Sequence, residues 1–145
     1  MKIAIGSDHA GFELKEKVLR HLQEKGWDVK DYGAYSEESL DYNDVAIEVA
    51  HDVRDGKMDR GILLCGTGIG MSIQANKVEG IRAAHVHDMF SAHDTRSHND
   101  SNVLAFGGRV LGVELANGIV DVWLKTPFSG DDRHARRVNK LTNKK

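Results

Sequence analysis

The amino-acid sequence predicts an α/β fold in which a five-stranded parallel sheet lies between two layers of helices, with a further helix at the C-terminus. Short apolar runs alternate with stretches of helical periodicity along the chain. This alternation is typical of parallel strands joined by right-handed helical crossovers, which cover both faces of the sheet. The 145 residues contain no repeat or low-complexity linker, so we expect one domain spanning residues 1–145. A chain of this length buries roughly 68 to 70% of its unfolded surface, so its core needs no disulfide or metal.

Five apolar runs are expected to form the strands of this sheet. In chain order they are residues 3–5, a run around Val29, and residues 62–64, 81–86 and 103–106. We expect the strand order 2-1-3-4-5, which places the first and third runs side by side. In open α/β sheets the ligand lies beyond the carboxyl ends of the strands, where the winding reverses direction. The loops after the first and third strands should therefore share one crevice.

Helical periodicity fills the segments between the strands. In chain order the helices are predicted from Leu14, Val18 and Leu22, from Val45, Val49 and Val53, from residues 69–77 and 88–96, and from Leu115, Ile119, Val120 and Trp123. Gly26 and Gly56 stand where C-terminal caps belong, and Asn43 is a candidate N-cap of the second helix. Pro127, the lone proline, marks the end of the helix that contains Trp123.

Composition and charge exclude several classes of function. The chain is 40% hydrophobic and 29% charged, and its net charge of −2 gives no general attraction to nucleic acid or to anionic membranes. The single cysteine cannot form an internal disulfide, no apolar run approaches the ~18 residues of a membrane span, and no apolar signal segment follows Met1. We expect a cytoplasmic protein that binds neither nucleic acid nor membranes.

The segment from residue 61 to residue 70 is the most informative one in the chain. An apolar strand delivers Cys65 onto a turn with three glycines in five residues, Gly66, Gly68 and Gly70. Such a turn exposes successive backbone N–H groups to a small anion, and a following helix adds the positive end of its dipole. This environment stabilises a thiolate and would make Cys65 usable as a base or nucleophile. A buried, inert cysteine beside a tight turn explains these ten residues equally well.

A second polar turn follows the first strand. Asp8 and His9 stand between that strand and the first helix, where a carboxylate can orient a sugar hydroxyl and an imidazole can bind an anion or move a proton. Asp8 alone is explained as a helix cap. The neighbouring Cys65 loop favours a role in ligand binding for both residues.

Other polar clusters are candidates for the same site. His98 and Asn99 lie at an element boundary, where histidine suits general acid work near neutral pH, although a solvated turn explains them too. Arg109, Arg133 and Arg137 are the best candidate phosphate ligands, because guanidinium groups match phosphate oxygens bidentately. Arg133 and Arg137 are spaced i and i+4 on a helical tail. They reach the glycine loop only if folding or dimerisation brings that tail there.

Three other kinds of site are disfavoured by the spacing of the residues. His85, His87, His93 and His98 suggest zinc, but His85 and His87 lie on an expected strand with no acidic or thiolate partner at a recognised spacing. A cysteine-dependent phosphatase loop needs an arginine six residues after the nucleophile, where this chain has Met71. A dinucleotide fingerprint needs G-x-G-x-x-G after the first strand, whereas this loop reads G-x-G-x-G after the third.

The same residues resemble one known family along nearly the whole chain. The matching segments are residues 6–12, 41–42, 65–73, 75–77, 97–100 and 102–107, together with Arg133-His134 and Arg137-Val138. The chain resembles the type B ribose-5-phosphate isomerases and the related galactose-6-phosphate isomerase subunits. The resemblance implies a Rossmann-like fold and homodimers, or tetramers built from them, whose active sites draw on both subunits. It also implies reversible conversion of ribose 5-phosphate to ribulose 5-phosphate with no metal or other cofactor.

The resemblance assigns a role to each matching residue. Cys65 would be the base that moves a proton between C1 and C2, and the amides of Gly66, Gly68, Ile69 and Gly70 would hold the enediolate oxygen. Thr67 would relay protons between the two oxygens, and His98 would assist ring opening. Asp8 and Asn99 would fix hydroxyls, Tyr42 would form a wall of the pocket, and His9, Arg109, Arg133 and Arg137 would hold the phosphate.

Departures from the family pattern leave alternatives open. Some relatives lack the cysteine and carry a glutamate just after the last loop glycine, but that position is Met71 here, so Cys65 is the candidate base. The segment after Asp41 lacks the family's usual proline and second tyrosine, so another aldose phosphate such as allose 6-phosphate is an alternative substrate. A non-catalytic sugar-phosphate binding module and a metal-dependent hydrolase are the alternatives from other classes.

Overall fold

The computed structural model describes residues 1–143; residues 144 and 145, the end of the expected C-terminal tail, lie outside the described residues. Five strands alternate with helices, and a short 3-10 turn, η1 (His9–Gly11), follows the first strand. The strands are β1 (Lys2–Ser7), β2 (Asp28–Asp31), β3 (Arg60–Cys65), β4 (Ala83–His85) and β5 (Val103–Gly107). The helices are α1 (Phe12–Glu24), α2 (Tyr42–Arg54), α3 (Ile69–Asn76), α4 (Met89–Ser97), α5 (Val113–Lys125) and α6 (Asp132–Thr142).

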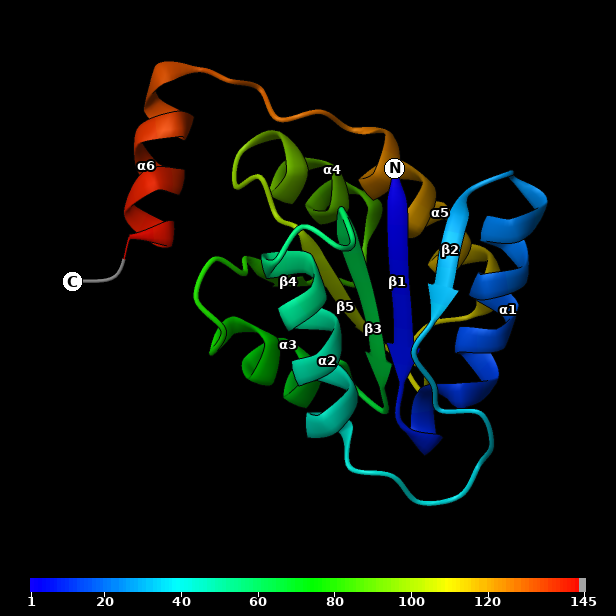
Figure 1. Ribbon diagram of the computed structural model, residues 1–145. Coiled ribbons are helices and arrows are strands. Elements are labelled where there is room, and N and C mark those ends of the chain that lie inside the picture. The colour runs from blue at the N-terminus through cyan, green and yellow to red at the C-terminus, as the bar shows by residue number, and fades with distance from the viewer. Residues whose placement is uncertain (144–145) are drawn as a thin grey trace.

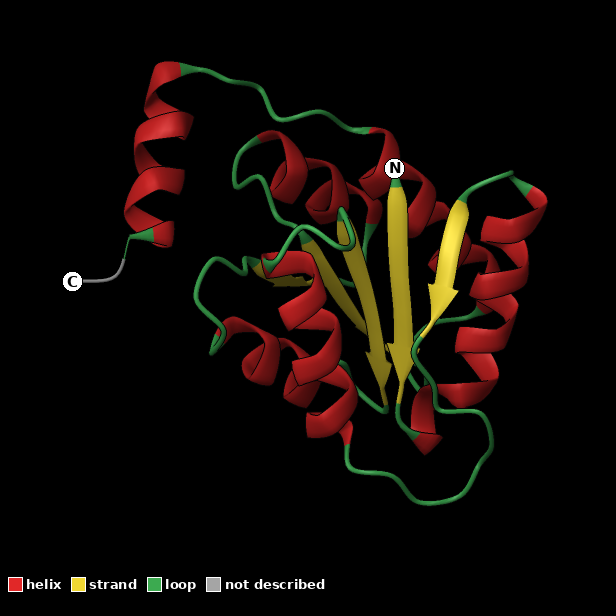
Figure 2. Cartoon of the chain, viewed as in Figure 1, coloured by secondary structure: helices red, strands yellow, loops and turns green. Residues whose placement is uncertain are grey.

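The predicted three-layer α/β architecture is confirmed. All pairings in the five-stranded sheet are parallel, and helices cover both of its faces (Figure 1, Figure 2). Because side chains alternate along a strand, Ile3 and Ile5 pack with α1, α4 and α5 on one face. Ala4, between them, packs with α2 and α3 on the other face. The two apolar layers hold the carboxyl ends of β1 and β3 side by side.

The predicted order of the last two strands is wrong. The sheet has the order β2-β1-β3-β5-β4, so β5 lies beside β3 and β4 forms the edge. All five residues of β5 are buried, whereas the three residues of β4 are partly or fully exposed. A strand buried on both faces is favoured in the interior of a parallel sheet, and a short strand with polar residues is tolerated at the edge. The strand predicted over residues 81–86 is also shorter in the structure, where β4 covers Ala83–His85.

Most of the predicted element ends agree with the structure. Gly26 and Gly56 follow the ends of α1 and α2 with φ values of 83° and 77°, in the left-handed region that glycine adopts at helix ends. Pro127 lies two residues beyond the end of α5. The prediction that Asn43 caps α2 is wrong, because the N-cap is Asp41 and the Asn43 amide donates to Gln74 Oε1 at 2.9 Å instead. Asn43 thus ties α2 to α3.

Helix α6 stands apart from the sheet and its covering helices, at the end of the connection formed by residues 126–131 (Figure 1). Its hydrogen bond to the body runs from Arg82 Nη1 to Thr142 Oγ1 over 3.2 Å. Leu141 of this helix is 59% exposed. In the part of the chain that the structure describes, no helix is both long and apolar enough to cross a membrane.

Candidate active site

A cleft lies at the carboxyl ends of β1 and β3, where the sequence predicts a shared crevice. It forms because β1 and β3 are neighbours in the sheet, so that the loops that follow them face each other. The residues that line it include nine of the predicted site residues: Asp8, His9, Tyr42, Cys65, Gly66, Thr67, Ile69, Gly70 and Arg109.

Cys65 ends β3 and is only 6% exposed, so it belongs to the core as well as to the wall of the cleft. Its Sγ atom accepts a hydrogen bond from the Gly68 N–H over 3.1 Å. Gly68 has a φ of 80°, and a Cβ atom there would lie 2.7 Å from the Phe106 Cα. Only glycine permits this close turn. The Gly68 amide and the N-terminus of α3 place partial positive charge beside the sulfur, which stabilises a thiolate.

The carbonyl groups of Cys65, Gly66 and Thr67 are each held by a group outside the loop. The Gly108 N–H donates to the Cys65 carbonyl over 2.8 Å, and the Arg109 N–H donates to the Gly66 carbonyl over 3.1 Å. The Thr67 carbonyl lies 2.7 Å from Nε2 of His85. Because the N–H of a trans peptide points opposite to its C=O, the amides of Gly66, Thr67 and Gly68 point away from these partners.

Several amides of this loop are therefore available to a ligand. Gly68 uses its N–H on Cys65 Sγ. The N–H groups of Gly66, Thr67 and Gly70 make no hydrogen bond within residues 1–143. Free backbone N–H groups close together in such a loop can form an anion-binding cradle. The arrangement suits a ligand that carries or develops negative charge on oxygen.

Asp8 acts as a helix cap and also lines the cleft. Its Oδ1 atom accepts the N–H groups of Ala10 and Gly11 over 2.9 and 3.1 Å, so its interpretation as a cap is confirmed for this oxygen. Asp8 Oδ2 makes no hydrogen bond to any described residue. Nδ1 of the neighbouring His9 accepts the Leu40 N–H over 3.1 Å. A neutral His9 therefore carries its proton on Nε2, which makes that atom a donor.

Two further side chains approach the glycines of the loop. A Cβ atom on Gly66 would lie 3.5 Å from Nη1 of Arg109, so the guanidinium lies against the loop. A Cβ atom on Gly70 would lie 2.6 Å from Cε1 of Tyr42, so glycine allows this ring to cover the start of α3. Arg109 is thus the only one of the three predicted phosphate-binding arginines that lines the Cys65 cleft.

The His98-Asn99 turn lies at the opposite end of the sheet. Cys65 pairs with Gly107 at the end of β5, whereas His98 and Asn99 precede Val103 at its start. The four steps from Val103 to Gly107 span about 13 Å of strand. Asn99 lines a separate groove with Arg82 and Leu141.

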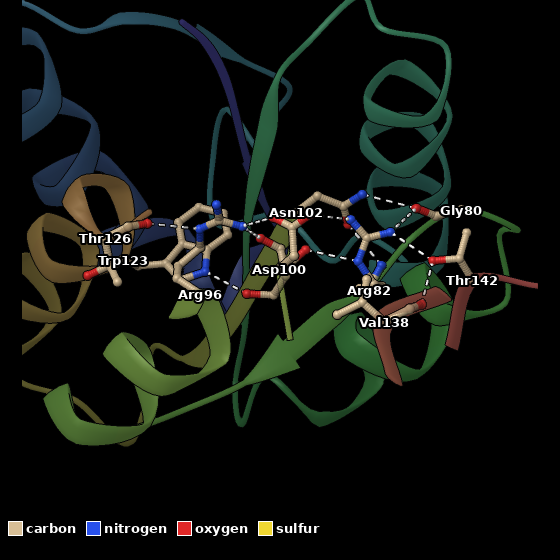
Figure 3. Close-up of polar contacts among 10 residues, drawn as sticks. Gly80, Arg82, Arg96, Asp100, Asn102, Trp123, Thr126, Val138 and Thr142 are labelled. Atoms are coloured by element: carbon tan, nitrogen blue, oxygen red, sulfur yellow. Dashed lines mark hydrogen bonds and ion pairs between the residues drawn. The ribbon is translucent and has the colours of Figure 1, made fainter. Parts of the chain in front are cut away.

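A polar network fixes the conformation of that turn (Figure 3). Asp100, directly after Asn99, has a φ of 49°, which is unusual for a residue other than glycine. Nη1 of Arg96 donates to Asp100 Oδ1 over 2.7 Å and to the Ser101 carbonyl over 2.7 Å. Nε of Arg82 donates to the Asp100 carbonyl over 2.9 Å from the other side. The two guanidinium groups hold Asp100 between them.

Helix α6 joins the His98 turn and not the Cys65 cleft. The ring of His134 lies over the ring of His98, with centroids 4.4 Å apart, and His134 Nδ1 lies 2.7 Å from Ser129 Oγ. Burial, followed by the nearby His98 and Arg133, lowers the pKa of His134. Arg133 and Arg137 are on this helix. Within one chain the predicted arginine cluster is therefore divided, with Arg109 at the cleft and the other two on α6, the helix whose His134 contacts His98.

Sequence reasoning missed some residues that shape the cleft. The spacing of His85 and His87 suggests only metal ligands, and Leu40 contributes through its backbone N–H, which no side-chain pattern reveals. In residues 1–143 no group of three or more His, Cys, Asp or Glu side chains is placed to hold a metal ion. The position of His85 and His87 at the end of an expected strand is the one sequence feature that points to a role near the cleft.

The chain is similar to known proteins over almost its full length. The profile of the Ribose/Galactose Isomerase family matches residues 3–141. Ribose-5-phosphate isomerase B of Escherichia coli (strain K12) is 52% identical over 141 residues, which cover 97% of this chain and 94% of that protein. D-erythrulose-4-phosphate isomerase of Pectobacterium atrosepticum is also 52% identical, over 97% of this chain and 93% of that protein.

The fold is similar to solved structures as well. The structure of ribose-5-phosphate isomerase B from Clostridium thermocellum superposes with a TM-score of 0.95 at 51% identity. The match covers 98% of this chain and 95% of that chain.

Proposed function

The chain belongs to the ribose/galactose isomerase family of sugar-phosphate isomerases, and we propose that it interconverts ribose 5-phosphate and ribulose 5-phosphate. Cys65 in its thiolate form removes the proton from C2 of the open-chain aldose. The electron pair forms the C1–C2 double bond of an enediolate, and the thiol returns the proton to C1. Thr67 relays a proton between the two oxygens, so that the C1 aldehyde becomes a hydroxyl and the C2 hydroxyl becomes a ketone.

One observation carries this proposal. Cys65 opens into the cleft beside amides of Gly66, Thr67 and Gly70 that no described residue uses. In the enediolate, negative charge develops on the substrate oxygens, which are the atoms that such amides bind. Removing one donor of this kind from an enzyme costs roughly 10² to 10³ in kcat. The loop therefore supplies a base and the stabilisation of the charge that the base creates.

Substrate binding requires groups from both ends of the sheet. Arg109 and His9 in the cleft bind the phosphate, and Asp8 and Tyr42 contact the sugar. His98 assists ring opening, Asn99 fixes a hydroxyl, and Arg133 and Arg137 complete the phosphate site.

These two sets of residues lie at opposite ends of one chain, so we expect a homodimer in which each site takes one set from each subunit. The exposed side chains of Ile69 and Ile73 beside the cleft and of Leu141 on α6 support an interface there. Two-fold symmetry would complete both sites at once.

A second substrate class is supported by similarity. The relative from Pectobacterium atrosepticum, named D-erythrulose-4-phosphate isomerase, is as similar to this chain as the Escherichia coli ribose-5-phosphate isomerase B. The same proton transfer between C1 and C2 would serve a four-carbon sugar phosphate. Allose 6-phosphate is a further candidate of the same class, whereas a non-catalytic binding module is disfavoured by relatives named isomerases.

The test is an assay of the purified protein in deuterated water with ribose 5-phosphate, erythrose 4-phosphate, allose 6-phosphate and galactose 6-phosphate. We expect turnover of ribose 5-phosphate with deuterium appearing on the carbon that receives the proton. The highest kcat/KM identifies the substrate. Binding of the sugar phosphates without exchange of the C2 hydrogen would refute an isomerase that works through an enediolate.

A further inference from the structure

We propose that His85 and His87 are positioning residues for the Cys65 loop, and that His87 must be neutral for the loop to keep its catalytic geometry. The inference rests on the proposed function for its kinetic part. Its structural part is independent of the substrate, because it concerns only how the loop is held.

His85 holds the loop at the point where the backbone gives no support. The Cys65 and Gly66 carbonyls are bound by backbone amides that follow β5, but the Thr67 carbonyl is bound by the His85 side chain. A carbonyl only accepts, so Nε2 of His85 carries a proton and donates it over 2.7 Å. Thr67 Oγ1 in turn accepts the Ile69 N–H over 3.2 Å, at the start of α3. His85 therefore sets the orientation of the peptide that contains the Gly68 N–H, the donor to Cys65 Sγ.

His87 holds the strand end behind the same loop. Its Nε2 atom accepts the Gly107 N–H over 2.9 Å. Gly107 pairs with Cys65 across the sheet, and a Cβ atom on Gly107 would lie 2.8 Å from the Gly66 carbonyl oxygen and 2.9 Å from the Thr67 Cα. A shift of Gly107 is thus transmitted directly to the loop.

The two histidines have opposite requirements for protons. His85 donates from Nε2 in its neutral or charged form, whereas His87 can accept at Nε2 only when that nitrogen carries no proton. Their rings meet edge to face with centroids 4.7 Å apart, so a charge on one disfavours a charge on the other. The charged or titratable groups that act on His87 are His85 and Asp88. Burial and then His85 lower the pKa of His87, while Asp88 raises it.

Protonation of His87 therefore removes the acceptor of the Gly107 N–H and turns a donor toward that amide. The strand end must move, and the loop that rests on it moves as well. A displacement of about 1 Å at a catalytic site costs on the order of 10²-fold in rate. We expect this protonation to contribute to the acid limb of the activity profile.

The experiment measures two properties in a set of matched variants. Because Cys65 is the only cysteine in the chain, the rate of its alkylation by iodoacetamide between pH 5 and 9 reports on the loop without any substrate. The second property is kcat and KM for ribose 5-phosphate over the same range. The variants are His85→Leu, His85→Gln, His87→Leu and His87→Gln. His93→Gln replaces an exposed histidine whose hydrogen bond is to its neighbour Asp94 and serves as the control.

We expect His85→Leu and His87→Leu to lower kcat by about tenfold or more, with a smaller change in KM, and to alter the rate of Cys65 alkylation. Glutamine places an amide donor or acceptor where Nε2 lies, so His85→Gln should restore most of kcat. His87→Gln should restore kcat and also remove a step from the acid limb, because glutamine does not titrate. His93→Gln should match the wild type in both measurements.

The two failures are distinguishable. If wild-type protein does not isomerise ribose 5-phosphate but the leucine variants alter alkylation and the glutamine variants restore it, the proposed function fails and the positioning role stands. If the leucine variants match the wild type in alkylation and in kcat, the positioning role is refuted. An acid limb in His87→Gln identical to that of the wild type refutes the requirement for a neutral His87. The glutamine variants keep the hydrogen bonds, so they test the proposal even where a leucine variant does not fold.

Discussion

The Cys65 half of the proposed active site is held mostly by backbone hydrogen bonds, whereas the His98 half is held by side chains. Around Cys65, the loop packs on the end of β5, and backbone amides of Gly108 and Arg109 bind its carbonyls. Around His98, the turn depends on the guanidinium groups of Arg82 and Arg96. The difference fits the roles proposed for the two halves, since proton transfer needs a fixed geometry and binding of a distant phosphate needs side chains that extend from the backbone.

The Cys65 half of the proposed site is also more buried than the His98 half. Cys65 is 6% exposed, whereas the His98 side chain is 45% exposed and lies against a helix that stands away from the body. In the proposed site the amides of the Cys65 loop bind oxygens at the reacting carbons, so the phosphate needs other groups, which in the cleft are His9 and Arg109. Helix α6, which carries Arg133 and Arg137, can contribute to the phosphate site of another copy of the chain. We infer that the proton transfer belongs to one subunit, whereas ring opening and much of the phosphate recognition belong to the other.

Replacing Cys65 should have the largest effect on kcat, and it should lower kcat for both the pentose and the tetrose phosphate. Cys65→Ala removes the proposed base, and general base catalysis contributes on the order of 10² to 10⁴ in rate. We expect kcat to fall by about 10³-fold with both ribose 5-phosphate and erythrose 4-phosphate. Circular dichroism should show the wild-type fold, because alanine fits the buried end of β3. Full turnover by a folded Cys65→Ala protein would contradict the assigned mechanism.

Replacing His98 should separate ring opening from proton transfer. Ribose 5-phosphate must open its furanose ring, whereas a tetrose 4-phosphate cannot close one, because its O4 carries the phosphate. We expect His98→Asn to lower kcat/KM for ribose 5-phosphate by about 10²-fold, the scale of one general acid, and to leave erythrose 4-phosphate nearly unaffected. Equal losses with both substrates would show that His98 does not act on the ring.

Removing the hydrogen bond between Arg82 and Thr142 of α6 should raise KM more than it lowers kcat. Arg82→Ala deletes the hydrogen bond to Thr142 and one side of the clamp on Asp100. Of the hydrogen bonds that are lost, the one to Thr142 positions α6, and the loss of a bond of roughly 1 kcal/mol predicts a rise in KM of about fivefold. The rate of Cys65 alkylation should not change. Arg20→Ala, which replaces an exposed arginine of α1 outside this network, is the control, and an unchanged KM in Arg82→Ala would contradict the link between this network and binding.

The smallest effect should appear in the pH dependence of stability. Burial lowers the pKa values of His87 and His134 in the folded protein. The unfolded chain then binds protons more readily, so the stability is fully present above the ordinary histidine pKa of about 6.5 and is lost as the pH falls through the lowered values. Melting temperatures between pH 5 and 8 should fall toward acid, and His134→Gln should fall less steeply. Identical slopes in wild type, His134→Gln and His93→Gln would contradict this.

The elements of the fold follow from local patterns, but the order of the last two strands does not. Residues 103–106 and 81–86 both read as apolar runs, and the difference between them lies in burial on both faces, which depends on neighbouring helices. The completely buried β5 lies in the interior of the sheet, and the short β4, with exposed His85, lies at its edge. A comparison of how apolar the two runs are on alternate residues would have pointed to this order.

The Cys65 half of the site was predictable because its residues follow adjacent strands. Asp8, His9 and Cys65 meet at the carboxyl edge of the sheet by the general rule for such folds. The grouping of His98 and Asn99 with Arg133 and Arg137 was not, because it depends on the path of residues 126–131 and on the stacking of His98 on His134. The hydrogen bond from His85 to the Thr67 carbonyl was not predictable from the sequence either, because it joins a side chain to a backbone group that is distant in the chain.

The most direct test of the divided site is complementation between two inactive variants. Cys65→Ala and the double variant Arg133→Ala/Arg137→Ala are each expected to be nearly inactive, because each damages both sites of a homodimer. Mixing after partial unfolding and refolding should produce heterodimers in which one of the two sites is intact. Random pairing of subunits then predicts a recovery of about one quarter of wild-type activity. Recovery to that level would support a site built from two chains, and a mixture as inactive as its separate components would contradict it.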